Sequence, residues 1–284
     1  MEKKFYYGSH VGISKHGLLG AIDEILKYNG NMIQIFITNP KARQTTKRSD
    51  EELLAIKHYA KQKDVKIVIH APYLLNLARE FDKDSWITKS LLDHLITCEK
   101  IGAIGVVFHM GKYLHLDKSD AINNMYLHIK YALDNSPENS KLILETSCGQ
   151  GTELGYRLEE FRIIYNKFSK MYKERLKICV DTCHVFAAGY DLTSKNKVNE
   201  FIKLFDKLIG WKNVALIHLN DSKYKVNNHL DRHELLDEGE IGLTGLAVII
   251  KFAYKFNIPL VLETPGGYPV EIGIIKNATK QRLV

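Results

Sequence analysis

Short apolar runs recur along the chain, and each is followed by a segment long enough to form a helix. The runs are rich in Val, Ile and Leu, which is typical of buried strands. We predict eight strands, at residues 5–9, 32–36, 65–69, 104–108, 142–144, 178–180, 214–217 and 259–262. The segments between them predict helices at residues 18–28, 84–101, 118–133, 158–172, 197–208 and 244–256, and one more helix that begins at residue 49.

Strands that alternate with helices predict a parallel sheet covered by helices. Eight such units in a chain of 284 residues favour an α/β fold with one (β/α)8 TIM-barrel domain over residues 1–284. Its active site would lie at the C-terminal ends of the strands. A doubly wound open sheet is the alternative. That fold usually has a glycine-rich phosphate loop after its first strand, and Gly8–Gly12 does not match the GxGxxG pattern.

The composition is that of an ordinary globular protein, with 45% hydrophobic and 26% charged residues. No apolar run is long enough to cross a bilayer, and Met1–Lys4 lead into a strand and not into a signal peptide. We therefore expect an intracellular, cytoplasmic protein that is not secreted. The four cysteines form no CxxC pair, which favours reduced thiols. A formal net charge of +7 suits a polyanionic partner such as nucleic acid.

Six consecutive strands end at a side chain that can bind a metal: His70, His109, Glu145, Asp181, His218 and Glu263. Any one of them alone would be interpreted as a loop histidine or a helix N-cap carboxylate. In a parallel barrel all six strand ends lie on one face, so together they predict a metal centre there. Three further candidates lie in loops on the same face, namely His184, Asp231 and His233.

Nine candidate ligands exceed the four that zinc usually takes. The set therefore predicts a multinuclear cluster with at least one bridging carboxylate. Its five histidines favour zinc over magnesium, which prefers oxygen ligands, and manganese or iron is compatible with one position. Neighbouring divalent ions suit phosphoester hydrolysis, because they lower the pKa of a shared water and neutralise charge on the phosphate oxygens.

Several segments resemble the endonuclease IV family, the zinc-dependent apurinic/apyrimidinic (AP) endonucleases of base-excision repair. The resemblance covers nearly the whole chain. Its most specific segments are VDTCH at 180–184, AAGYDL at 187–192, HLNDSK at 218–223, DRH at 231–233, LETP at 262–265, LET at 144–146 and GQG at 149–151.

The resemblance implies three zinc ions and a role for each candidate ligand. The first ion would be held by His70, His109 and Glu145. Glu145 would bridge to a second ion, completed by Asp181, His218 and Glu263. The third would be held by His184, Asp231 and His233. The catalytic residues would be Glu145, Glu263 and His109, with Glu145 positioning the attacking water.

The resemblance also implies DNA contacts on the same face. Tyr73 matches an aromatic that wedges into the duplex beside the abasic site, which helps to offset the cost of unstacking. The loop after the second strand, with Asn39, Lys41 and Arg43, resembles a DNA-penetrating loop. It departs from the family pattern, which usually has arginine in place of Lys41 and a large group such as tryptophan in place of Arg43. Further expected backbone contacts are Lys112, Gln150, Lys223 and Arg232.

We therefore expect a hydrolase of DNA repair that cleaves double-stranded DNA on the 5′ side of an abasic site. It would leave a 3′-hydroxyl and a 5′-deoxyribose phosphate. The resemblance also implies a monomer and a secondary removal of 3′ blocking groups. One rival is a sugar isomerase or epimerase, for which four of the ligands, Glu145, Asp181, His218 and Glu263, would suffice. The other is a DNA-binding protein without catalysis, which is disfavoured because every ligand position holds a competent side chain.

Overall fold

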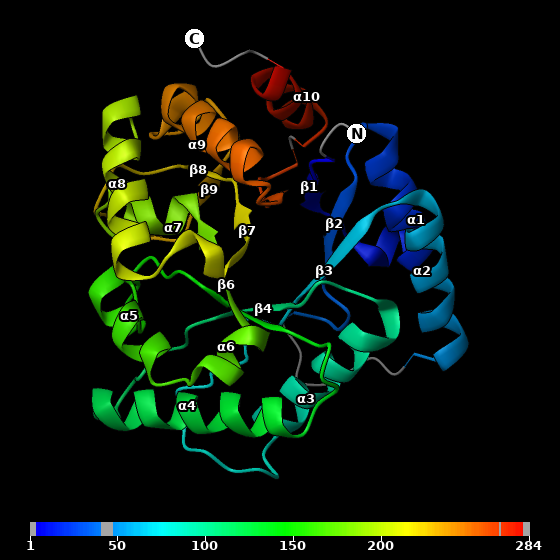
Figure 1. Ribbon diagram of the computed structural model, residues 1–284, viewed down its shortest axis with the longest axis vertical. Helices are drawn as coiled ribbons and strands as arrows, with labels where there is room; N and C mark the ends of the chain where they lie inside the picture. Colours follow the sequence, from blue (N-terminus) through cyan, green and yellow to red (C-terminus); the bar gives the residue numbers. More distant parts are fainter. Residues whose placement is uncertain (1–3, 41–47, 267, 281–284) are drawn as a thin grey trace.

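Eight parallel strands close into a barrel in a computed structural model that describes residues 4–40, 48–266 and 268–280 (Figure 1). The order around the barrel is β1-β10-β7-β6-β5-β4-β3-β2. The predicted TIM barrel is confirmed. The strands are β1 (Tyr7–His10), β2 (Met32–Ile35), β3 (Lys66–His70), β4 (Val106–His109), β5 (Leu142–Glu145), β6 (Leu176–Asp181), β7 (Val214–His218) and β10 (Leu260–Leu262).

Helices surround the barrel and cover the outer face of the sheet (Figure 1). The predicted cap at residue 49 is confirmed, because the Ser49 side chain accepts a hydrogen bond from the backbone N–H of Glu52. None of the described helices is long and apolar enough to cross a membrane. The helices are α1 (Ile13–Lys27), α2 (Asp50–Lys63), α3 (Trp86–Ile101), α4 (Lys118–Asp134), α5 (Leu158–Asn166), α6 (Lys170–Arg175), α7 (Thr182–Ala187), α8 (Lys195–Leu208), η1 (Trp211–Asn213), α9 (Gly242–Phe256) and α10 (Tyr268–Lys280).

Some helix predictions were wrong in detail. The first helix begins earlier than predicted, at Ile13. It is kinked at Gly17, whose φ of 66° is a value that glycine adopts without steric strain. The helix predicted at 158–172 is two helices, α5 and α6. The second of these ends at Arg175, whose guanidinium donates to three backbone carbonyls and one hydroxyl between residues 133 and 140. Helices α7 and α10 were not predicted.

Residues that point into the barrel form one closed apolar layer, made of Met32, Val68, Val107, Ile143, Cys179, Leu216 and Val261. Side chains two residues apart on a strand point to the same side. The residue two positions after each member of this layer therefore lies one step nearer the C-terminal mouth of the barrel. Six of these seven positions hold the predicted metal ligands, and the seventh holds Gln34.

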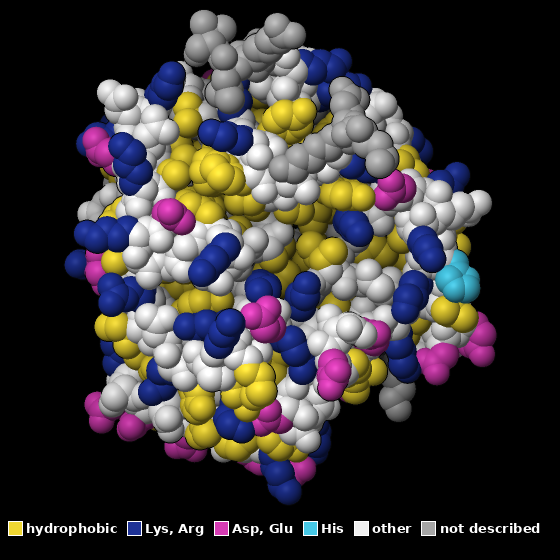
Figure 2. Space-filling model, in the orientation of Figure 1, with side chains coloured by type: hydrophobic (Ala, Val, Ile, Leu, Met, Phe, Trp, Pro, Cys, Tyr) yellow, Lys and Arg dark blue, Asp and Glu magenta, His cyan; other side chains and the backbone are white. Residues whose placement is uncertain are grey.

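Charge on the face shown in Figure 2 is mixed, with Lys and Arg side chains spread among Asp and Glu. The net charge of +7 is therefore not collected in a single basic patch on that face.

Candidate metal centre

The six strand-end candidates meet at the mouth of the barrel. Strand register places His109 opposite Glu145 on β4 and β5, and Asp181 opposite His218 on β6 and β7. Glu145, Asp181 and His218 are fully buried. Burying several ionisable groups together is costly unless they are paired or bind metal, so this layer is built for chemistry and not for core packing.

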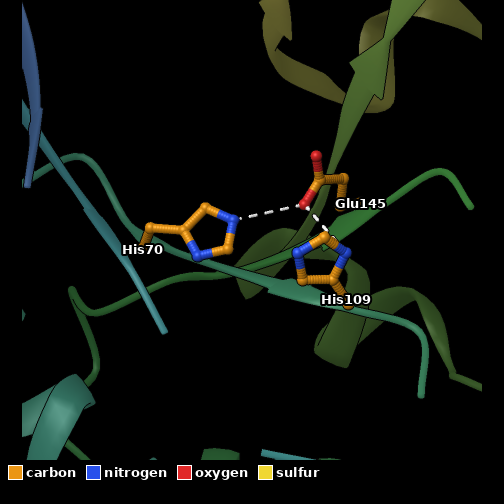
Figure 3. Close-up of side chains that lie close together, drawn as sticks. All are labelled: His70, His109 and Glu145. Atoms are coloured by element: carbon orange, nitrogen blue, oxygen red, sulfur yellow. Dashed lines mark hydrogen bonds and ion pairs between the residues drawn. The ribbon is translucent and has the colours of Figure 1, made fainter. Parts of the chain in front are cut away.

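A first group consists of His70, His109 and Glu145, which converge from three neighbouring strands (Figure 3). The Oε2 atom of Glu145 lies 3.3 Å from Nε2 of His70 and 3.6 Å from Nδ1 of His109. One ligand atom from each residue lies within 4.8 Å of the others, a spacing that one metal ion can span.

A second group shares Glu145 with the first and adds Asp181, His218 and Glu263. Here the other oxygen of Glu145, Oε1, lies 2.8 Å from Nδ1 of His218. The same nitrogen lies 3.0 Å from Oε2 of Glu263 and 3.7 Å from Oδ2 of Asp181. The two oxygens of Glu145 thus face two different groups, as a bridging carboxylate requires.

A third group is formed by His184, Asp231 and His233. The Nε2 atoms of both histidines lie 3.2 Å from Oδ1 of Asp231. His184 is placed by the first turn of α7, where the N-cap residue Asp181 accepts its backbone N–H at 2.8 Å through Oδ1. Asp181 therefore combines the ordinary role of a helix cap with a place in the second group.

The long loop after β7 carries Asp231 and His233 of the third group to the mouth of the barrel. A short antiparallel ribbon pairs β8 (Asp221–Ser222) with β9 (His233–Glu234), and Ser222 lies opposite His233. The buried carboxylate of Asp221 holds the rest of this loop by accepting four backbone N–H groups, from residues 222, 237, 241 and 242.

Burial penalises charge on the histidines of the cluster, and neighbouring carboxylates oppose it. Burial lowers the pKa of His109. For His184, Asp181 and Asp231 outweigh burial and hold the pKa well above its ordinary value. For His233 the same two carboxylates raise the pKa to about 9. The metal-free cluster therefore holds protons on the third group that a metal ion would displace.

The carboxylates of the second group remain ionised although they are buried. Burial favours protonation of Glu145, but His109 and His218 hold its pKa well below the ordinary value. The pKa of Glu263 is lowered against the effect of burial, chiefly by His218. Metal binding needs ionised carboxylates, and imidazoles that are either neutral or able to release a proton.

The donor set fits divalent transition metals. Among the described residues, four buried histidine Nε2 atoms make no hydrogen bond, and two of them belong to the cluster, those of His109 and His184, although Asp231 lies close to the latter. Buried nitrogens without partners are rare unless a ligand completes them. Five imidazoles and four carboxylates suit zinc or manganese. Cys179 and Cys183 also border the groups. Burial raises the pKa of each thiol to about 12, so both are protonated in the metal-free cluster, and Cys179 belongs to the apolar layer.

Comparisons with known proteins agree on one family. The model of the xylose isomerase-like TIM barrel family matches residues 22–281. A "Probable endonuclease 4" of Halothermothrix orenii is 37% identical over 268 residues, covering 91% of this chain and 92% of that protein. An endonuclease 4 homologue of Acanthamoeba polyphaga mimivirus is 36% identical over 265 residues, covering 91% and 85%. The chain belongs to the endonuclease IV family.

The structural comparison supports the same assignment. The crystal structure of endonuclease IV from Thermus thermophilus matches with a TM-score of 0.82 and 28% identity over 97% of both chains. A D-psicose 3-epimerase matches with a TM-score of 0.63 and 13% identity, over 94% of this chain and 89% of that one, which shows a shared fold alone. As a member of this family, the protein is a nuclease of the hydrolase class, which is the enzyme type predicted from the sequence.

The predicted DNA contacts differ in how exposed they are. Tyr73 is 58% exposed, and its ring packs 5.6 Å from that of His109. With Lys112 and Gln150 it lines a cavity of about 370 Å³ that reaches His109 and Asp231. Lys112 forms a half-exposed ion pair with Glu153, at 3.4 Å.

Other predicted contacts are less defined. Lys223 and Arg232 are exposed on the loop after β7, where the guanidinium of Arg232 bonds the backbone carbonyl of Asp231. Asn39 is exposed and lines a separate cavity of about 500 Å³. Lys41 and Arg43 lie outside the described residues.

Sequence reasoning missed two polar residues of the same layer, on the first two strands. His10 ends β1 and Gln34 lies in β2, and the amide of Gln34 contacts both His218 and Glu263. The signal was present in the sequence, since Gln34 interrupts the apolar run 32–36. Glutamine is not a usual zinc ligand, so the type of side chain does not single it out.

Proposed function

We propose that this endonuclease IV family member is a zinc-dependent AP endonuclease of base-excision repair. It would bind three zinc ions per chain, with manganese possible in one position. The first would be held by His70, His109 and Glu145, and the second by Glu145, Asp181, His218 and Glu263. The third would be held by His184, Asp231 and His233. The support is that these three sets converge as separate groups with Glu145 between two of them.

The reaction would be hydrolysis of the phosphodiester on the 5′ side of an abasic site. Bound divalent ions supply Lewis-acid charge that lowers the pKa of water to about 7 and neutralises phosphate oxygens. Water adds its oxygen to phosphorus, and the bond from phosphorus to the 3′ oxygen of the preceding nucleotide breaks. The displaced proton ends on that 3′ oxygen. The products are a 3′-hydroxyl and a 5′-deoxyribose phosphate.

The protein's own residues would orient this reaction. Glu145 lies between the first and second groups, so it would position the attacking water. His109 and Glu263 flank it on either side and complete the catalytic set. Because five of the nine ligand candidates are buried at the mouth of the barrel, the scissile phosphate must reach inward, which requires the damaged nucleotide to leave the base stack.

Double-stranded DNA with an abasic site would lie across the same mouth. The exposed ring of Tyr73 would wedge into the duplex, and Lys112, Gln150, Lys223 and Arg232 would contact the backbone, with Asn39, Lys41 and Arg43 on a second loop. Since a single chain supplies all nine ligand candidates, we propose that the enzyme acts as a monomer. Removal of 3′ blocking groups would use the same centre.

The observation that carries this proposal is the position of Glu145, with Oε2 facing His70 and His109 and Oε1 facing His218. The test is a nicking assay on an abasic duplex, with metal analysis of the same preparation. We expect three metal ions per chain, a nick 5′ to the lesion, loss of cleavage in EDTA and recovery with zinc. A single metal per chain would favour the sugar isomerase. Metal-replete protein that binds abasic DNA and never cleaves it would favour the non-catalytic binder.

A further inference from the structure

A buried amide lies in the same layer as the metal-ligand candidates. Gln34 is fully buried in β2, two residues after Met32 of the apolar layer, so its side chain faces the mouth of the barrel. It is a poor core residue, because an amide without partners in the interior is costly. Its partners are therefore informative.

Gln34 contacts two members of the second group. Its Nε2 atom donates to Oε1 of Glu263 at 2.5 Å, and its Oε1 atom lies 2.8 Å from Nε2 of His218. The amide N–H also points toward Nδ1 of His10, at 3.4 Å. One side chain thus joins a carboxylate to an imidazole.

These contacts fix the orientation of the amide and, through it, the imidazole. Reversing the amide would set its oxygen against the oxygen of Glu263, two acceptors at 2.5 Å. With the oxygen facing His218, the imidazole must present a proton on Nε2. Its Nδ1 atom is then the nitrogen that faces Glu145 and Glu263, toward the centre of the second group.

Three of the other four histidines of the cluster obtain the same control from the main chain, and His109 is the exception. Nδ1 of His70 bonds the carbonyl of residue 71, Nδ1 of His184 that of residue 146, and Nδ1 of His233 that of residue 263. His218 differs because its Nε2 atom contacts a side chain, that of Gln34, and not the main chain. Its orientation therefore depends on the identity of residue 34, which substitution can change.

We propose that Gln34 is a positioning residue that holds His218 as the Nε2–H tautomer, and Glu263 in place, for the metal ion of the second group. This inference rests on the metal binding proposed above. Residues that orient metal ligands in this way typically contribute about 10- to 100-fold in metal affinity or activity. The contribution should be confined to one ion of the three.

The test compares Gln34→Met, which keeps the length of the side chain and removes both hydrogen bonds, with Ser140→Ala. Ser140 is buried near the start of β5, at the opposite end of the barrel, and its hydroxyl bonds the carbonyl of Leu95 at 2.7 Å. Zinc affinities would be measured by competition with a chromogenic chelator. We expect one of three zinc ions to bind about 10- to 100-fold more weakly in Gln34→Met, with cleavage restored by excess zinc. Ser140→Ala should bind all three as the wild type does.

A second measurement avoids any folding defect of the variant. In zinc-loaded wild-type protein labelled with ¹⁵N-histidine, NMR should show His218 protonated at Nε2. The inference is overturned if that proton is on Nδ1, if Gln34→Met binds zinc as the wild type does, or if it weakens all three ions equally. A wild-type protein that binds no zinc would instead overturn the proposed function.

Discussion

Glu145 has the most demanding position of the candidate ligands. It is fully buried and its two oxygens face histidines from different groups. A carboxylate can do this because it offers two equivalent acceptors and one negative charge. A glutamine of the same shape offers one acceptor, and its amide nitrogen can only donate.

Glu145→Gln should therefore abolish cleavage while leaving DNA binding nearly intact. We expect the single-turnover nicking rate to fall by more than about 100-fold, because a ligand contributes at least as much as a residue that orients one. Affinity for an abasic duplex, measured with excess zinc so that the cluster stays filled, should change little, since phosphate contacts dominate it. The control is Glu159→Gln, the same change at an exposed position of α5. Wild-type cleavage by Glu145→Gln would refute the assigned role.

At the scale of an element, the loop after β7 is organised by Asp221. Its buried carboxylate accepts four backbone N–H groups, and burial raises its pKa. Gly239 packs so closely that an added Cβ would lie 2.5 Å from Oδ1 of Asp221. The ribbon that positions His233 begins at this residue. The geometry of the third group thus depends on a carboxylate outside the cluster.

Asp221→Ala should loosen this loop and weaken the third metal ion. Leaving several backbone N–H groups buried without an acceptor should cost roughly 3 kcal/mol of unfolding free energy. Urea denaturation and zinc stoichiometry would measure both effects. Asp191→Ala is the matched control, because Asp191 holds only an exposed turn at Thr193 and should cost less than about 1 kcal/mol. Equal losses in the two variants would contradict this account.

The strand ends were predictable because a polar residue after a buried apolar run is a local signal. Gln34 also interrupts an apolar run, but a glutamine is not a usual metal ligand. The break between α5 and α6 had no comparable local signal. The end of α6 depends on Arg175 reaching carbonyls distant in sequence, such as that of Leu133. The membership of the three groups followed from the resemblance and not from spacing along the chain, because spacing does not give the distance between loops; the structure brings the same residues together.

For the whole molecule, the raised pKa values of the third group predict how stability depends on pH without metal. A histidine whose pKa is raised on folding stabilises the protein below its unfolded pKa of about 6.5, and this contribution is lost as the pH rises through the folded value. For His233 that value is about 9. The free energy of unfolding of EDTA-treated protein should thus fall between about pH 6.5 and 9.

Urea denaturation at several pH values would measure this slope, and His233→Asn should flatten it. Zinc-loaded protein should behave differently, because metal binding displaces those protons and is favoured as the pH rises. A metal-free protein that gains stability over the same interval would contradict the assigned charges.

DNA binding should depend steeply on salt, since each neutralised phosphate adds about 0.9 to the slope of log affinity against log salt. Lys112→Gln should reduce that slope by roughly one. The control is Lys61→Gln on the exposed surface of α2, which should leave the slope unchanged. A flat salt response of the wild-type protein would count against DNA lying across the barrel mouth.

The shared position of four carboxylates at the barrel mouth has an electrostatic consequence. Glu145, Asp181, Asp231 and Glu263 would together carry four negative charges, which the protonated His184 and His233 of the metal-free cluster offset only in part, and three divalent ions would bring six positive ones. Loading would then invert the sign of the local potential, from one that repels phosphate to one that attracts it. The ions would therefore control DNA binding as well as cleavage. The metal-free cluster would repel the DNA backbone at the barrel mouth, and the metal-loaded cluster would attract it.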